Sequence, residues 1–501
     1  MKIIDKNGRL TIDKREVDEL IAAKNFIGLN HSPRAEKVIV SLTSYKPRIL
    51  DVKYTIYSLL NQTFPPDLLI LWLDEDSFPQ REKNLPRDLL ELRAFGLTID
   101  WCENLRPYKK LIPALKKFPD DIIVTADDDL FYRPDWLKIL YDEHIKNPDC
   151  FIAHFCHRMR LDTSGRIYPR ENWHPMFKPA IPSPPKFTNS FGTGGGGVLL
   201  KRALLYADVL RHDLFMNLSP IDDEAWFWSM AVLNGTKTKI PIGAQNKLIY
   251  VDVDTQVNGE TLWSVNKTQS DVQLRQIVEH YPALLDILIR ETVESKPLIS
   301  VVAPVKNPAN LSACIQNIFW QSFPDFELIL VNLGARVNLP PLPTNFRVVN
   351  YPGGSIVDAL NLGLRKATGD YVLFKDENSI LPNDALDLAT RAADGSKADV
   401  IHFAGHIQLA GNGGNFVADD APELRRDVPT IFDVPEQLRG VMWLQGKLSR
   451  RLGTKIFRRD FLTAHGLTFG NDTTDFMFRA LVAAERYLLV PQAFGFFKEA
   501  T

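Results

Sequence analysis

The sequence predicts an α/β protein made of two tandem domains, each built on a mostly parallel β-sheet. Apolar, β-branched segments alternate with helical segments along the chain, which is typical of βαβ units. The two halves also repeat each other. SLLNQTFPPDLLILWLDEDS (58–77) and NIFWQSFPDFELILVNLGAR (317–336) share a helix end, a Gln, a Phe-Pro turn and a buried strand. We therefore expect two domains of the same architecture.

The first strand of each half indicates where the domains begin. VIVSLTSYKPR (38–48) and LISVVAPVKNP (298–308) start with near-continuous Val, Ile and Leu, which fits a parallel strand buried on both faces. The charged segment ETVESKP separates the halves. The expected organisation is an N-terminal extension at 1–36, a first domain at 37–290, a linker at 291–297 and a second domain at 298–501.

The composition is that of an ordinary soluble globular protein. Of its 501 residues, 45% are apolar and 24% are charged, and the net charge of −2 provides no general attraction for nucleic acid. The charged amino terminus lacks the apolar core of a signal peptide, and no apolar run is long enough to span a membrane. The four cysteines lack CxxC spacing, which suits reduced thiols. We expect a cytoplasmic protein without a nucleic-acid partner.

Three consecutive acids, Asp127, Asp128 and Asp129, follow the predicted strand IIVTA. They lie at the carboxyl end of a parallel strand, where open α/β sheets bind ligands. In a strand, residues two apart point the same way, so we expect Asp127 and Asp129 to converge on one object while Asp128 faces elsewhere. Converging carboxylates repel unless a cation lies between them, and oxygen ligands favour Mg²⁺ or Mn²⁺. We predict a metal site at Asp127 and Asp129; the alternative is a solvated turn that caps the next helix.

Other segments of the first half supply further parts of a ligand site. Asp74 ends the strand of LWLDEDS, where a carboxylate can accept hydrogen bonds from a nucleobase or ribose. Lys109 and Lys110 of PYKKLIPAL can meet a diphosphate, with ordinary surface lysines as the alternative. In FGTGGGGVLL, Gly195 and Gly196 lack a Cβ, so the backbone there can approach a bulky ligand closely.

A second acidic cluster stands before a Trp-rich helix. The segment SPIDDEAWFWSMA (219–231) contains Asp222, Asp223 and Glu224. One acid at a helix start can serve as a cap, but three exceed what a cap requires. We therefore expect a functional role for at least one of them.

Together these motifs make the first half resemble a family 2-type glycosyltransferase of the GT-A fold, in a bacterial branch associated with surface polysaccharides. The resemblance covers most of residues 38–275. It rests on SLTSY, NQTFPPDLLILWLDEDS, PYKKLIPALKKFPDDIIVTADDDLFYRPDWL, FGTGGGGVL, PIDDEAWFWSMAVLNG and LWSVNKTQSDVQL. It implies two tandem GT-A domains and the transfer of a sugar from a nucleotide-sugar donor to a glycan or lipid-linked acceptor. Membrane association is expected only peripherally, through the acceptor.

The resemblance also implies roles for single residues. The acidic triplet matches the DxD motif that holds Mn²⁺ or Mg²⁺ and the donor diphosphate, so Asp127, Asp128 and Asp129 belong to the donor and metal site. Thr43, Tyr45 and Asp74 are expected to contact the nucleoside. Asp223 or Glu224 is expected to be the general base, and the two acids stay open because the family usually shows two Asp before the Trp. A single displacement inverts the anomeric configuration.

The second half resembles the same superfamily but departs from it at the site. Leu333 stands where the nucleoside-binding Asp is expected, and the metal motif reads Asp376-Glu377-Asn378. Asn378 can donate an oxygen to a metal but contributes no charge. Asp475 lies near the expected position of the base. We expect a weakened or non-catalytic second domain, with a bifunctional polymerase as the alternative.

Three rival readings have less support. The run GTGGGG matches a dinucleotide-binding fingerprint, but no buried strand precedes it and it lies in the middle of the domain. A metal site at His402 and His406 fails because VIHFAGHIQL is predicted as a strand, in which four residues span about 13 Å. A non-catalytic carbohydrate-binding or scaffold protein conflicts with the intact acidic clusters of the first half.

The difference between the two acidic motifs gives the first testable prediction. Asp127→Asn in the first domain should remove most sugar transfer, whereas Asp376→Asn should leave it unchanged, because the second motif has already lost a carboxylate. Transfer from a nucleotide-sugar donor, measured for both variants, checks this. If Asp376→Asn stops the addition of a second, distinct sugar while the first is still transferred, the second domain is an active transferase.

Overall fold

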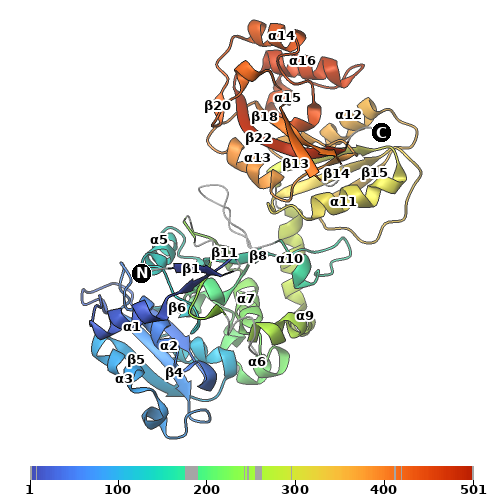
Figure 1. Ribbon diagram of the computed structural model, residues 1–501. Coiled ribbons are helices and arrows are strands. Elements are labelled where there is room, and N and C mark those ends of the chain that lie inside the picture. Colours follow the sequence, from blue (N-terminus) through green and yellow to red (C-terminus); the bar gives the residue numbers. More distant parts are fainter. Residues whose placement is uncertain are drawn as a thin grey trace. The chain divides into compact units, whose positions relative to one another are not determined.

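The structure is a computed structural model, and it forms two compact units. It describes residues 3–6, 8–174, 190–241, 243–244, 247–253, 262–294, 296–410, 413–418 and 420–498. Unit 1 comprises residues 1–159 and 169–291, and unit 2 comprises residues 160–168 and 292–501. In Figure 1, unit 1 runs from blue to light green and unit 2 from yellow to red, apart from the short segment 160–168.

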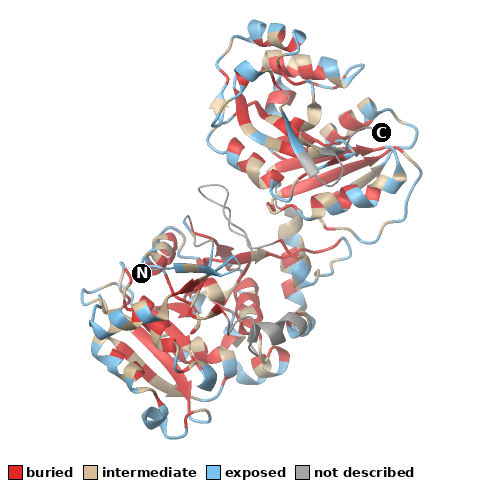
Figure 2. Ribbon diagram, in the orientation of Figure 1, coloured by how far each residue is buried: buried red, intermediate tan, exposed pale blue. Residues whose placement is uncertain are grey.

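Unit 1 is built on a seven-stranded sheet with the order β11-β7-β10-β6-β3-β4-β5. Strands β3, β4, β5 and β6 are parallel, while β10 runs antiparallel between β6 and β7. The strands are β3 (Val38–Thr43), β4 (Leu68–Asp74), β5 (Leu97–Cys102), β6 (Ile122–Ala126), β7 (Cys150–Ala153), β10 (Val198–Leu200) and β11 (Lys237–Lys239). Nearly every residue of β3, β4 and β6 is buried, as Figure 2 shows, which explains their unbroken apolar sequences.

Helices and short strands complete unit 1. The helices are α1 (Lys14–Ala22), α2 (Val52–Leu59), α3 (Arg87–Glu91), α4 (Ile112–Lys117), α5 (Trp136–Lys146), α6 (His212–Leu218), α7 (Asp223–Leu233), α9 (Leu262–His280) and α10 (Pro282–Glu294). The N-terminal extension forms a hairpin of β1 (Ile3–Lys6) and β2 (Arg9–Ile12), and β2 pairs with β12 (Ile249–Tyr250). A separate two-stranded sheet joins β8 (Cys156–Arg158) and β9 (Ser190–Gly192).

Unit 2 repeats the same core. Its ten-stranded sheet has the order β15-β14-β13-β16-β21-β18-β22-β17, with β19 and β20 paired to β18 and β22. Strands β13 to β16 are parallel and β21 is antiparallel, so β15-β14-β13-β16-β21 matches β5-β4-β3-β6-β10 of unit 1. The predicted repeat of two α/β domains with mostly parallel sheets is confirmed.

The strands of unit 2 are β13 (Ile299–Val305), β14 (Phe326–Asn332), β15 (Phe346–Asn350), β16 (Tyr371–Phe374), β17 (Ser379–Ile380), β18 (Val400–Ala410), β19 (Gly413–Ala418), β20 (Thr430–Ile431), β21 (Lys455–Arg458) and β22 (Tyr487–Lys498). Its helices are α11 (Leu311–Phe319), α12 (Ile356–Lys366), α13 (Ala385–Ala393), α14 (Glu436–Leu444), α15 (Arg459–Ala464) and α16 (Thr473–Ala483). Both His402 and His406 lie on β18, as the predicted strand requires.

The repeated Gln of the two halves has the same task in both units. In unit 1, Gln62 donates to the carbonyl of Arg133 at 2.9 Å and accepts from the N–H of Leu137 at 3.0 Å. In unit 2, Gln321 donates to the carbonyl of Pro382 at 2.7 Å and accepts from the N–H of Leu386 at 3.0 Å. Both glutamines are fully buried. Each glutamine therefore ties the segment after an acidic motif to the end of a helix, which is α2 in unit 1 and α11 in unit 2.

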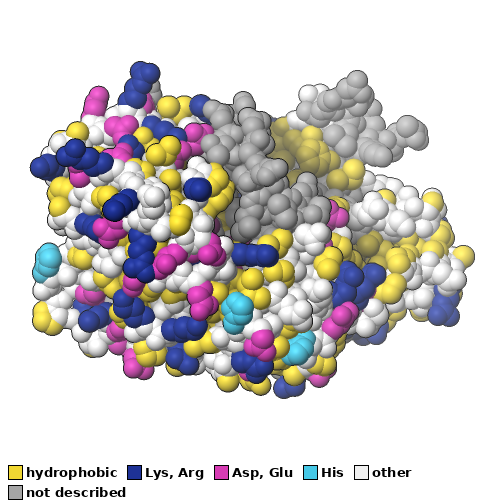
Figure 3. Space-filling view, turned by 90° about the horizontal axis from the view of Figure 1, so that it is seen from below, with side chains coloured by type: hydrophobic (Ala, Val, Ile, Leu, Met, Phe, Trp, Pro, Cys, Tyr) yellow, Lys and Arg dark blue, Asp and Glu magenta, His cyan; other side chains and the backbone are white. Residues whose placement is uncertain are grey.

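The surface carries charges of both signs. On the face shown in Figure 3, Lys and Arg are interspersed with Asp and Glu. Among the described residues, no helix has the length and apolar character needed to cross a membrane.

The glycine run of unit 1 gives a prediction about stability. Gly197 has a φ of +91°, and a Cβ there would lie 2.4 Å from the buried ring of Trp136. Gly235 has a similar φ of +79°, but a Cβ there would meet nothing within 4 Å. Gly235→Ala should therefore cost only the backbone strain of about 1–2 kcal/mol.

Gly197→Ala should cost about 1–3 kcal/mol more, because Trp136 must also move. Thermal unfolding of both variants measures the difference. Equal midpoints for the two variants would mean that Trp136 adapts without cost.

Candidate active site

The acidic triplet lies at the carboxyl edge of the unit 1 sheet, directly after β6. Strand β6 ends at Ala126, so Asp127, Asp128 and Asp129 belong to the following turn. Strand alternation therefore does not extend to them, so the orientation of Asp127 and Asp129 is set by the turn. Asp128 and Asp129 contact the same side chain, that of Arg48, while Asp127 contacts Lys110. The metal assignment to Asp127 and Asp129 remains a prediction.

Arg48 holds two of the three acids. Its Nη1 lies 2.9 Å from Oδ1 of Asp128 and 2.9 Å from Oδ2 of Asp129. Ser44 also donates to Asp128, at 2.5 Å. Burial raises the pKa of Asp129 to about 7; Arg48 opposes this rise and the neighbouring acids add to it. Burial likewise raises the pKa of Asp128.

Lys110 connects the triplet to the second acidic cluster. Its Nζ lies 3.0 Å from Oδ1 of Asp127 and 3.3 Å from Oδ2 of Asp223. Burial favours the neutral amine, but the charges of Asp127, Asp223 and Glu224 outweigh it and raise the pKa of Lys110 well above its ordinary value. The ammonium of Lys110 is therefore a fixed positive charge between two groups of carboxylates.

The three acids of the second cluster lie at the start of α7 and make different contacts. Asp222 caps the helix by accepting from the N–H of Ala225 at 3.1 Å. Asp223 is buried beside Lys110, and burial raises its pKa. Glu224 is only partly buried and accepts from the N–H of Gly194 at 2.5 Å. Burial raises the pKa of Glu224 to about 7, against the opposing charge of Lys110.

The glycine run lies beside these acids. A Cβ on Gly194 would lie 3.0 Å from Nζ of Lys110 and 3.1 Å from Oε1 of Glu224. One on Gly195 would face Oδ2 of Asp127 at 3.7 Å. Gly196 instead has Phe155 against it and accepts from the indole N–H of Trp136 at 2.6 Å. Of the two predicted donor-binding glycines, Gly195 borders the acids and Gly196 packs into the core.

The residues predicted to contact the nucleoside, Asp74, Thr43 and Tyr45, lie at the ends of β4 and β3 or just after them. Asp74 is fully buried, and both Lys109 and the N–H of Ser77 donate to it. These hydrogen bonds outweigh burial and lower the pKa of Asp74. Thr43 donates to the carbonyl of Trp72 at 2.8 Å, and the exposed ring of Tyr45 lies beside the Arg48 guanidinium. The two predicted lysines are thus separated: Lys109 pairs with Asp74, and Lys110 reaches the acidic clusters.

In unit 2 the acids of the corresponding motif and Asp475 have partners within the same unit. Asp376 accepts from the N–H of Asn378 at 2.8 Å, and Glu377 accepts from the N–H groups of Lys306 and Asn307 at 2.9 and 3.2 Å. Asp475 lies in the first turn of α16 and pairs with Arg479 at 2.8 Å. Leu333, at the position matching Asp74, is buried. These contacts resemble those of a structural turn.

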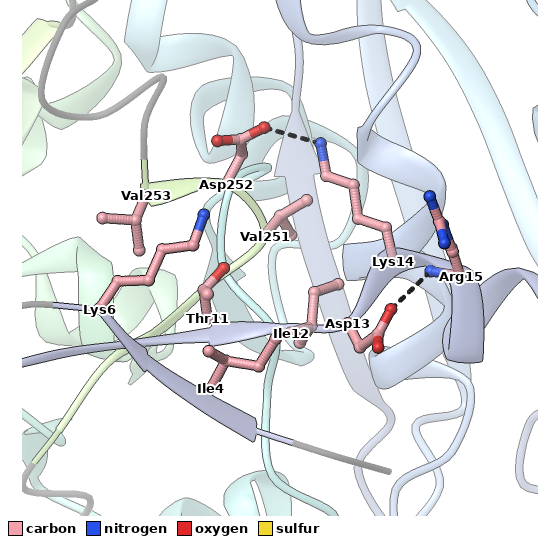
Figure 4. Close-up of a pocket in the computed structure, with 10 residues that line it drawn as sticks. All are labelled: Ile4, Lys6, Thr11, Ile12, Asp13, Lys14, Arg15, Val251, Asp252 and Val253. Atoms are coloured by element: carbon pink, nitrogen blue, oxygen red, sulfur yellow. Dashed lines mark hydrogen bonds and ion pairs between the residues drawn. The ribbon is translucent and has the colours of Figure 1, made fainter.

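The N-terminal extension borders the triplet and forms a pocket of about 350 Å³ (Figure 4). The N–H of Val251 donates to the carbonyl of Asp129 at 2.9 Å, which attaches this region to the acidic turn. Lys14 pairs with Asp252 at 2.9 Å and with Asp51 at 3.0 Å. The pocket is lined by Ile4, Lys6, Thr11, Ile12, Asp13, Lys14, Arg15, Val251, Asp252 and Val253. The predicted site residues lie outside this lining.

The acidic site suits a divalent cation completed by a ligand. Arg48 contacts Asp128 and Asp129, and Lys110 contacts Asp127 and Asp223, so these four carboxylates share two cationic side chains. A bound cation would add favourable charge to such a cluster. Among the described residues, no group of three or more His, Cys, Asp or Glu side chains is arranged to hold a metal. Mg²⁺ is commonly bound by one or two carboxylates together with substrate phosphates, and this donor set fits that pattern.

Sequence reasoning missed Ser44, Arg48 and Arg170. Arg170 donates to Asp222 at 2.6 Å, from a segment that carried no motif. A signal for Arg48 existed, because it follows the predicted nucleoside contact Tyr45 by three residues at the same sheet edge. No sequence signal pointed to Arg170.

One protein-family model matches a segment in each half of the chain. The family model described as "Glycosyl transferase family 2" matches residues 45–206 and 300–466, more than half of the chain. A protein described as the uncharacterized glycosyltransferase EpsJ of Bacillus subtilis (strain 168) is 23% identical over 217 residues, which cover 40% of this chain and 61% of the relative. An uncharacterized glycosyltransferase of Haemophilus influenzae (strain ATCC 51907 / DSM 11121 / KW20 / Rd) is 34% identical over 108 residues, 18% of this chain and 40% of the relative. The chain thus spans about three fifths or less of these relatives' lengths.

Solved structures show distant similarity. The S. aureus protein TarS in complex with UDP-GlcNAc has a TM-score of 0.32 and 20% identity, covering 40% of this chain and 59% of that one. The mannosyltransferase PcManGT of Pyrobaculum calidifontis, in complex with GDP-Man and Mn²⁺, has a TM-score of 0.27 and 17% identity, covering 41% of this chain and 58% of that one.

The cation deficit at the triplet yields a prediction about metal binding. Asp129→Ala should abolish Mn²⁺-dependent binding of a nucleoside diphosphate while the protein stays folded, because a carboxylate at the ligand edge carries little packing. Calorimetric titration with the diphosphate, with and without Mn²⁺, measures this. Asp100→Ala removes a carboxylate from β5 that pairs with Lys117 and serves as the control. Retained metal-dependent binding in Asp129→Ala would contradict the metal assignment.

Proposed function

Because the chain belongs to glycosyl transferase family 2, we propose that unit 1 transfers a sugar from a nucleotide-sugar donor to a hydroxyl group of a glycan or lipid-linked acceptor. The observation that carries this proposal is the junction at Lys110, which joins the acidic triplet to the acids of α7. One group of acids suits a metal-bound diphosphate, and the other suits proton removal from an acceptor. The reaction is a single displacement that inverts the anomeric carbon, in the synthesis of a surface polysaccharide.

The donor side of the site provides positive charge next to acids. A divalent ion at Asp127 and Asp129 supplies charge neutralisation for the leaving diphosphate when bound. Lys110 and Arg48 are already fixed at the same acids and add two cationic side chains near the leaving group. Thr43, Tyr45 and the Asp74–Lys109 pair form the edge assigned to the nucleoside.

On the acceptor side, Glu224 is better placed than Asp223 to be the general base. Asp223 is buried against Lys110, whereas the Glu224 side chain is partly exposed next to Gly194. The pKa of Glu224, about 7, also suits a base that must bind and release a proton near neutral pH. Asp223 then keeps Lys110 in position between the two clusters.

The backbone-satisfied acids of unit 2 support a non-catalytic role for that unit. Asp376 and Glu377 accept from backbone N–H groups, and Leu333 replaces the nucleoside-binding acid. We assign unit 2 a structural or acceptor-binding role.

The assignment of the base predicts a pH dependence. A carboxyl group acts as a base only when ionised, so wild-type turnover should rise as the pH increases through about 7. Glu224→Gln should lower turnover by about 10²- to 10⁴-fold, remove this rise and leave donor affinity nearly unchanged, because the base acts on the acceptor. Initial rates at saturating donor between pH 5 and about 9 measure both effects.

Asp223→Asn is the matched comparison. In this variant, any loss of turnover should be accompanied by weaker donor binding, because Lys110 loses a partner beside the triplet. If Asp223→Asn abolishes turnover with unchanged donor affinity and Glu224→Gln does not, Asp223 is the base.

A further inference from the structure

Residues 160–168 form a hairpin that belongs to unit 2, although the chain on both sides of it belongs to unit 1. Backbone bonds incorporate it there: the N–H of Thr163 donates to the carbonyl of Leu342 at 2.8 Å, and that of Thr344 donates to Leu161 at 3.0 Å. The guanidinium of Arg160 lies over the ring of Phe319, 3.9 Å from its centroid. The ring of Tyr168 lies 5.7 Å from the same Phe319 ring. Both ends of the hairpin are thus fixed around Phe319.

The hairpin is also ordered by its own contacts. Asp162 accepts from the N–H and the hydroxyl of Ser164, at 2.9 and 2.5 Å, and from the N–H of Arg166 at 3.0 Å. Leu161 pairs with Ile167 across the hairpin. The segment therefore has a defined conformation within unit 2.

One end of the hairpin leads to Arg170, which contacts the cap of α7. After Tyr168 and Pro169 comes Arg170, whose guanidinium donates to Asp222 and whose N–H donates to Asp271 at 3.0 Å. The same guanidinium lies over the ring of Phe191, 4.4 Å from its centroid. Asp222 caps α7, the helix that begins with Asp223 and Glu224. Arg170 therefore holds the cap of the catalytic helix.

The other end leads to the glycine run. Strand β8, which ends two residues before Arg160, pairs with β9 in the register Cys156 to Gly192. The N–H of Thr193 donates to the carbonyl of Phe155 at 2.9 Å, and the next residue is Gly194, which donates to Glu224. Both ends of the hairpin thus continue into segments that position Glu224.

We propose that Arg170 is a positioning residue for Glu224, and that unit 2 secures Arg170 by holding the hairpin 160–168 in its own fold. This inference rests on the proposed function of unit 1. It gives unit 2 a specific task, which is to order the chain segments that carry the cap of α7 and the glycine run. Since a displacement of about 1 Å can cost about 10²-fold in rate, small changes in this support should reach the chemistry.

The test changes one position in each unit, and each position has a control variant. Arg170→Gln should lower kcat by at least about tenfold at nearly constant donor KM, and Arg170→Lys should recover part of the loss because it keeps the charge beside Asp222. Arg202→Gln, at an exposed arginine of unit 1, is the control. Phe319→Ala, which changes only unit 2, should lower kcat in the same way, while Phe416→Ala, at an exposed ring of unit 2, should not.

Hydrogen exchange provides a readout that does not depend on activity. The amides of residues 222–228 should exchange faster in Arg170→Gln and in Phe319→Ala than in wild type and the controls. Unchanged exchange and kcat in Phe319→Ala would overturn the role of unit 2, and unchanged values in Arg170→Gln would overturn the whole inference. If wild type shows no donor turnover, the proposed function fails, and the exchange comparison alone decides the positioning role.

Discussion

The site of unit 1 depends on the pairing of a crowded set of carboxylates with two fixed cations. Arg48 joins Asp128 and Asp129, and Lys110 joins Asp127 and Asp223. Without these cations, acids brought together at a buried sheet edge would have to take up protons or move apart. The pairing therefore allows two acidic segments, far apart in the sequence, to meet at one edge. It also leaves an excess of negative charge, which would be the electrostatic basis for the proposed metal-bound diphosphate.

The two units share one scaffold, but the acids of their motifs have different hydrogen-bond partners. The buried glutamines Gln62 and Gln321 make equivalent hydrogen bonds, so the acidic turns are held in the same way in both units. The middle acid of each motif also contacts the loop after the first strand. In unit 1 Asp128 does so through the side chains of Ser44 and Arg48, and in unit 2 Glu377 does so through backbone N–H groups. The difference lies in the side chains and not in the fold.

Much of this could be predicted from the sequence, because the relevant signals are local. Strands such as β3 and β13 are apolar runs, the repeat is visible in two matching segments, and the acids follow strand ends. The orientation of Asp127 and Asp129 could not be predicted, because it depends on β6 ending at Ala126. Arg48 and Asp128 are 80 positions apart, and their contact requires the parallel pairing of β3 and β6. The different partners of Lys109 and Lys110 likewise depend on the short helical turn that they share.

The hairpin 160–168 lies beyond what local patterns can show, and it changes how the tandem arrangement is understood. A linker at 291–297 alone would describe two domains joined at one point. Because 160–168 is part of unit 2, the chain passes between the units three times, and two of these passages flank the segments that support Glu224. Under this proposal, a unit in which Leu333 and Asn378 replace site acids would still be required for catalysis. Unit 2 would contribute by holding the hairpin 160–168, and the chain segments on both sides of this hairpin would keep the acids of unit 1 in position.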